Sequence, residues 1–245
     1  MSANVLALVL LAALLHAGWN SLIKAGADKA VEMALMRVAG LLLALPVLAF
    51  TGLPARESWP WLLLSGAIHF GYYYLLAKAY ERGNLSVVYP VMRGVAPVLV
   101  ALLGWTWLGE AFSPWAAGGV AAVALGVLWL GLLGRPTHQA SDRRSGLPWA
   151  LLNAVVIAAY TLTDAQGVRA SGNAVAYVMT LALLEGPPFA LWVVWRCRGQ
   201  GVALRATVRQ RWPWALGGAA ASLASYGIAL WAMTQAPVPL VAAAR

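Results

Sequence analysis

The stretch Val5–Ile23, VLALVLLAALLHAGWNSLI, contains no charged residue and decides the class of this protein. As a helix rising about 1.5 Å per residue, it is long enough to cross the hydrocarbon core of a bilayer, about 30 Å thick. The preceding residues, 1–4, include no Lys or Arg, whereas a cleaved signal peptide begins with a basic region. We interpret the stretch as a retained first transmembrane helix.

Apolar segments of similar length recur along the 245 residues of the chain. They lie at residues 5–23, 31–52, 60–79, 85–108, 115–133, 148–168, 174–195 and 213–234, and a ninth begins near Pro237. Each should be a helix, because lipid offers no hydrogen bonds to the open edge of a sheet. The sequence therefore predicts an all-α, polytopic membrane helix bundle with about eight full spans plus a short stub.

The composition agrees with a bundle embedded in lipid. The chain is 62% hydrophobic and only 10% charged, whereas about a quarter of the residues in soluble domains are charged. A net charge of +9 could indicate a nucleic-acid partner, but most Lys and Arg residues separate the apolar segments, as in membrane proteins. With a single cysteine, Cys197, and three scattered histidines, we expect no disulfide framework, metal site or cofactor.

The cations between the segments predict the orientation. Every second connection, starting with the first, is rich in Lys and Arg: Lys24, Lys29, Arg82, Arg135, Arg143, Arg144, Arg196, Arg198, Arg205, Arg209 and Arg211. The alternate connections hold only Arg56 and Arg169. By the positive-inside rule the first set faces the cytoplasm and the N-terminus lies outside, in a multi-pass protein of the inner (plasma) membrane.

An internal repeat is visible in a Trp-Pro-Trp motif. WPWL at residues 59–62 recurs as WPWA at residues 212–215, which gives a period of five helices. An odd number of spans inverts the second repeat relative to the first, as in many secondary transporters. We predict a first repeat over residues 1–140 and a second over residues 146–245, the latter incomplete, with three helices and a stub.

Two further motifs carry a resemblance to a known family. The stretch YPVMRGVAP at residues 89–97, followed by LGE at 108–110, resembles the fourth-helix signature of EamA-type transporters of the drug/metabolite transporter superfamily. HAGWN at residues 16–20 is similar to the first helix of that family. The resemblance implies ten helices around a central cavity, which opens alternately to each side. It also implies export or exchange of small organic solutes such as amino acids, metabolites or drugs.

Arg93 is the candidate site residue with the clearest physical argument. It lies roughly 12 Å into the core if its helix begins near Leu85. A central Arg costs about 2.5–3.5 kcal/mol even on lenient scales, so it should face the bundle interior or water. Arg93, with Tyr89 one turn before it, could bind an anionic group of the solute. The alternative is that Arg93 pairs with an internal carboxylate or reaches the membrane interface.

Other polar and aromatic residues share helix faces inside the predicted spans. The substrate-binding candidates among them are His16, Trp19, Asn20, His69, Tyr73, Asn153, Tyr160 and Tyr226. The alternative for each is a packing contact between helices.

Glu185 is the candidate for proton coupling. It lies midway along residues 174–195, beside Gly186-Pro187-Pro188, where a buried carboxylate could carry a proton. The alternative is a structural hydrogen bond to the backbone near the prolines. Asp164 and Glu110 lie near predicted helix ends, and we expect both at the membrane interface.

These features together predict a secondary transporter of small organic solutes working by alternating access, with possible proton coupling. The chain has no P-loop, so a gradient would drive transport. A membrane-embedded enzyme is a rival, but it would need His, Asp or Ser clustered at one depth. A membrane assembly factor without transport activity is the second rival, for which a repeat would have no purpose.

Overall fold

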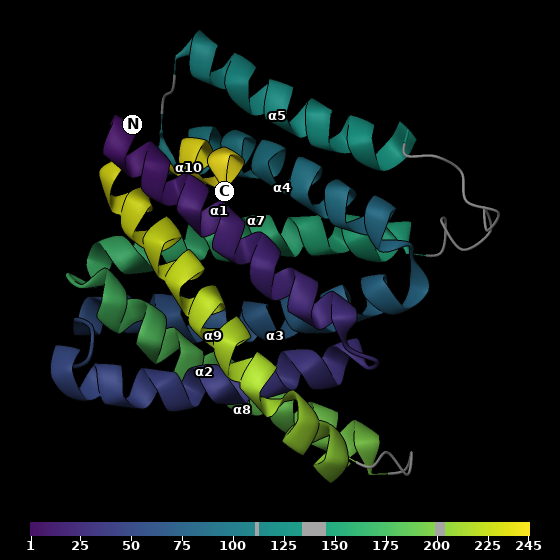
Figure 1. The fold of residues 1–245 in the computed structure, drawn as a ribbon. Helices are drawn as coiled ribbons and strands as arrows, with labels where there is room; N and C mark the ends of the chain where they lie inside the picture. The colour runs from purple at the N-terminus through teal and green to yellow at the C-terminus, as the bar shows by residue number, and fades with distance from the viewer. Residues whose placement is uncertain (111–112, 134–145, 199–203) are drawn as a thin grey trace.

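A computed structural model gives the fold and describes residues 1–110, 113–133, 146–198 and 204–245 (Figure 1). Within these ranges the secondary structure is helical. The elements are α1 (Ala3–Ala25), α2 (Lys29–Thr51), the short 3-10 helix η1 (Arg56–Ser58), α3 (Trp59–Arg82), α4 (Leu85–Leu108), α5 (Pro114–Leu133), α7 (Leu147–Ala170), α8 (Ala174–Cys197), α9 (Leu204–Gln235) and α10 (Val238–Ala244).

Local sequence explains where several helices begin. Side chains of Ser2, Asp28 and Asn173 accept hydrogen bonds from backbone amides in the first turns of α1, α2 and α8. Except at the start of α9, the predicted segments agree with the helices to within three residues. The first turns of α9 are polar, so hydrophobicity alone did not reveal them, and the helix continues through Pro213.

Six of the described helices are long and apolar enough to cross a membrane: α1, α2, α4, α7, α8 and α9. Large apolar side chains on the outside, such as Leu14 (72% exposed) and Trp115 (91% exposed), fit a surface that faces lipid. The predicted stub corresponds to α10. The prediction of eight spans is not settled by these criteria and stays a prediction, and the predicted boundary between the repeats lies outside the described residues.

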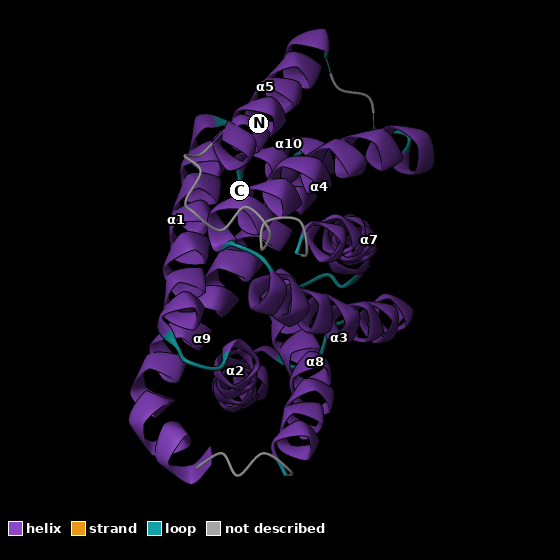
Figure 2. Ribbon diagram, turned by 90° about the vertical axis from the view of Figure 1, so that its right-hand side faces the viewer, coloured by secondary structure: helices purple, strands orange, loops and turns teal. Residues whose placement is uncertain are grey.

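The most extensive contacts join helices from the two ends of the sequence. The pairs α2 with α8, α3 with α7, and α1 with α9 make large interfaces, and α2 also packs on α9 and α3 on α8. Figure 2 shows this interlocking with α2 and α7 seen nearly end-on, while α5 lies at the edge beside α4. The interior between these pairs is where side chains from both halves meet.

Ion pairs gather at the end of the bundle that holds the α1–α2 and α3–α4 connections. Arg196 near the end of α8 pairs with Asp28 and, at 3.1 Å, with Glu81. Arg211 of α9 pairs with Glu32 at 2.7 Å. Partial burial disfavours the charge on Asp28, but hydrogen bonds from Arg196 and from backbone amides outweigh it and lower the pKa of this carboxyl group.

Candidate functional site

A small cavity lies in the interior between the interlocked helices. Its volume is about 40 Å³, so it could hold only water-sized molecules in this conformation. Seven of the predicted site residues line it: His16, Trp19, His69, Tyr73, Tyr160, Glu185 and Tyr226. The cavity also has lining residues that the sequence analysis did not name, among them Arg37, Ser222 and Arg245.

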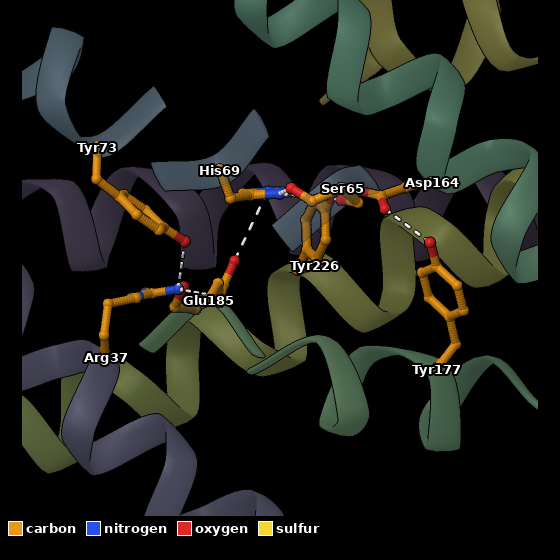
Figure 3. Close-up of polar contacts among 9 residues, drawn as sticks. Arg37, Ser65, His69, Tyr73, Asp164, Tyr177, Glu185 and Tyr226 are labelled. Carbon is orange, nitrogen blue, oxygen red and sulfur yellow. Dashed lines mark hydrogen bonds and ion pairs between the residues drawn. The ribbon is translucent and has the colours of Figure 1, made fainter. Parts of the chain in front are cut away.

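A buried ion pair joins α2 to α8 at one side of this cavity (Figure 3). Arg37 Nη1 donates to Glu185 Oε1 at 2.8 Å and to the Tyr73 hydroxyl at 3.0 Å. Arg37 Nη2 donates to Ser222 Oγ at 2.8 Å. Gly186 permits the close approach of the two helices, because a Cβ there would lie 3.2 Å from the Arg37 carbonyl oxygen. Glu185 is therefore held by a cation from the opposite half of the chain.

His69 of α3 lies between this ion pair and a second buried carboxylate. Its Nε2 is 3.8 Å from Glu185 Oε2, and its Nδ1 is 3.1 Å from Ser65 Oγ. The imidazole ring also packs on Tyr160, with ring centroids 4.4 Å apart. Figure 3 shows His69 and Ser65 in a row between Glu185 and Asp164.

Asp164 of α7, which the sequence analysis placed near a helix end at the membrane interface, is fully buried among the helices of the bundle. The Tyr177 hydroxyl of α8 donates to its Oδ1 at 2.8 Å, and the Tyr226 hydroxyl of α9 donates to its Oδ2. The sequence did not predict this burial, because distance from a helix end describes position along one helix only. In the bundle α3, α8 and α9 cover this part of α7.

Arg93 and Arg245 form the cationic side of the site. Both line a second small cavity, of about 20 Å³, which shares Tyr160 and Arg245 with the central cavity. Both interact electrostatically with His16, and the Arg245 guanidinium lies 4.8 Å from the centre of the Tyr226 ring. Neither arginine forms an ion pair with a side chain in the described part of the chain.

Three predicted residues lie away from the central cavity. Asn20 and Tyr89 line an open groove of about 280 Å³, together with Lys24 and Tyr80, toward the end of the bundle that carries the ion pairs. Asn153 is buried and donates to the sulfur of Met92 at 3.1 Å. The structure therefore gives Asn153 a packing contact and none of the three a place at the centre.

Arg37 is, with Ser222 and Arg245, one of the lining residues that the sequence analysis missed. A signal was present, because Arg37 lies inside the apolar segment 31–52 just as Arg93 lies inside 85–108. The count of cations included only the connections between segments, so it left out an Arg inside a segment. An unpaired Arg in the membrane is costly at either position, so the argument used for Arg93 would also have identified Arg37.

Comparisons with known proteins bear on both fold and family. The sequence profile of the EamA-like transporter family matches residues 3–132, more than half of the chain. None of the curated proteins matches the sequence. Among solved structures 13 chains match the fold, one of them a crystal structure with a TM-score of 0.70 and 18% sequence identity. That match covers 99% of this chain and 85% of the other, and at this identity it shows the fold alone.

The family match agrees with the motifs at residues 16–20 and 89–97, both of which lie inside the matched range. It also agrees with the apolar helices long enough to cross a membrane. The chain is a multi-pass membrane protein and belongs to the EamA-like transporter family.

Proposed function

We propose that this protein is a secondary transporter of small organic solutes in the inner membrane, an exporter or exchanger that works by alternating access. Two inverted repeats, over residues 1–140 and 146–245, would enclose the solute. The helix contacts support such a repeat, since exchanging α1 with α7, α2 with α8 and α3 with α9 converts the α3–α7 interface into α9–α1. The same exchange converts α2–α9 into α8–α3 and leaves α2–α8 unchanged.

The observation that carries the proposal is the central cavity lined by polar residues of both repeats. His16, Arg37 and His69 come from the first, and Tyr160, Glu185 and Tyr226 from the second. Its volume of about 40 Å³ is too small for an organic solute, whereas the groove beside Lys24 measures about 280 Å³. A closed centre together with a separate groove toward one end of the bundle is compatible with alternating access.

The charge of the site favours a solute with an anionic group. Arg93 and Arg245 reach the interior without a carboxylate partner among the described side chains. An unpaired guanidinium in the membrane core is costly, and a carboxylate or phosphate of the solute would offset that cost. We propose that these two arginines bind the anionic group, with Tyr160 between the two cavities that they line.

A transport assay in proteoliposomes would test this proposal. Three solute sets serve as probes: amino acids, organic acids and organic cations without a carboxylate. We expect transport within the first two sets. Arg93→Ala should raise the solute concentration for half-saturation at least about tenfold, which corresponds to a loss of about 1.4 kcal/mol of binding free energy. Arg93→Lys should rescue poorly, because an ammonium lacks the planar pair of donors.

Arg56→Ala is the matched control, because Arg56 is an exposed arginine of η1. It should transport like the wild type. Transport of the organic cations alone, or full activity in Arg93→Ala, would contradict the anion site. Absence of transport for every set, in protein that reconstitutes correctly, would contradict a transporter of these solutes.

A further inference from the structure

Asp164 has an environment unlike that of the other carboxylates in the described part of the chain. Five of those carboxylates pair with Arg or Lys: Asp28, Glu32, Glu81, Glu110 and Glu185. Glu57 is exposed. Asp164 is fully buried, and its hydrogen-bond donors are hydroxyl groups instead of cations.

The groups that face Asp164 come from each helix packed on it. These are Ser65 and His69 of α3, Tyr160 one turn before it on α7, Tyr177 of α8 and Tyr226 of α9. His69 is the only one of them that can carry a positive charge. Farther off, Arg93 of α4 and Arg245 after α10 act on Tyr160, and the charged residues of η1 are exposed.

We propose that Asp164 is the carboxyl group that takes up a proton in the transport cycle, while Glu185 stays paired with Arg37. A buried charge without a cationic partner is costly, and the neutral acid removes that cost. Glu185 has the Arg37 guanidinium at 2.8 Å, which stabilises its charge instead. This inference deepens the proposed function. The role of the proton in transport rests on that function, but the proton site itself can be tested without any solute.

The groups around Asp164 provide a path for the proton, and its binding changes their hydrogen bonds. His69 lines the central cavity, so a proton can pass from water there through the His69 imidazole and the Ser65 hydroxyl to Asp164. An O–H bond forms on Asp164 and the corresponding bond of the donor breaks. The new O–H takes the place where the Tyr226 hydroxyl donates, so that hydroxyl group must reorient and can accept from the acid instead. Arg245 lies over the Tyr226 ring, so the same tyrosine contacts both the proton site and the proposed anion site.

Infrared difference spectroscopy on the purified full chain in lipid nanodiscs tests the proton site. The signal is the carbonyl stretch of a protonated carboxyl group, recorded as the pH is lowered to about 6, where ordinary Asp and Glu side chains are still ionised. We expect the wild type to gain this band, Glu185→Gln to keep it and Asp164→Asn to lose it. A band that survives in Asp164→Asn, or no band in the wild type, would overturn the proposal.

A second variant guards against misfolding of Asp164→Asn. Tyr226→Phe keeps the carboxyl group but removes one hydrogen bond to its ionised form, so the band should appear at higher pH. Tyr74→Phe on the same helix as His69 is the control, because the Tyr74 ring packs on Trp149 and Trp192, away from Asp164. No hydrogen bond to the Tyr74 hydroxyl is found among the described residues, so this variant should show the band at the same pH as the wild type. If the band of Tyr226→Phe appears at the same pH as that of the wild type, the result would count against Asp164 as the proton site.

Transport then links the proton to the cycle. In proteoliposomes, a pH gradient should drive accumulation by the wild type, and Asp164→Asn should exchange solute without responding to the gradient. Gradient-driven accumulation in Asp164→Asn would contradict the proposal. If no solute is transported at all, the proposed function fails while the infrared band still decides where the proton binds.

Discussion

Glu185 and Asp164 are two buried carboxylates in the same interior, yet their surroundings differ in kind. Glu185 accepts a hydrogen bond from a guanidinium at 2.8 Å, and Asp164 accepts from two phenols. His69 lies between them on α3. The comparison teaches that burial by itself does not identify a proton site, because the partner decides whether the charge is stabilised.

The largest expected effect comes from removing the cation beside Glu185. Arg37→Ala leaves a buried, uncompensated carboxylate and should lower the free energy of unfolding by about 3–5 kcal/mol. The combined variant Arg37→Met, Glu185→Leu removes both charges and should recover most of that loss. Thermal unfolding in detergent at neutral pH measures both. A double variant as unstable as Arg37→Ala would show that the two residues do not act as a pair.

Removing one phenol beside Asp164 should have a smaller effect that depends on pH. Tyr177→Phe deletes the 2.8 Å hydrogen bond to Oδ1. A hydrogen bond to a charged group contributes about 1.5–3 kcal/mol, and one between neutral groups about 1 kcal/mol. The loss of stability in Tyr177→Phe should therefore grow as the pH rises and Asp164 ionises. Unfolding curves at mildly acidic and at alkaline pH would show it, and an equal loss at both would mean that the charge of Asp164 does not change.

The smallest effect is expected at Asp28, a carboxylate that is partly exposed at the end of the bundle. It extends the comparison to a carboxylate in contact with water. Asp28→Asn removes the charge that pairs with Arg196 but keeps an oxygen to cap α2. We expect a loss below about 1 kcal/mol. Because folding lowers the pKa of Asp28, this contribution is present above its unfolded value of about 3.9 and disappears as the pH falls through the folded value. An unfolding titration that gives the same difference at low pH would contradict the ion pair.

The helices could be predicted from the sequence because lipid leaves few alternatives. An apolar segment of spanning length must be helical, and its ends are marked by charges and capping residues. Spacing of three or four residues also placed His16 with Trp19, and His69 with Tyr73, on faces that line the cavity. Such local patterns contain no information on which helix will lie opposite.

The candidate site was harder to predict because its key contacts join distant residues. Arg37 and Glu185 are 148 positions apart, and Asp164 and Tyr226 are 62 apart. Position along one helix placed Asp164 near an end, and only the covering helices bury it. Asn153 is likewise decided by its neighbours, since its side-chain amide donates to the sulfur of Met92 and the residue does not line the central cavity.

The pairing of α1 with α9 fixes the order in which the protein can be assembled during synthesis. Ser225 Oγ of α9 donates to the Ala12 carbonyl oxygen of α1 at 2.7 Å, and the buried His16 and Asn20 lie on the same helix. Roughly 180 residues separate the end of α1 from the start of α9. At about 5–20 residues per second, the ribosome needs about 10–40 s to make them. The α1 helix must therefore stay in the membrane without its α9 neighbours until α9 has been translated.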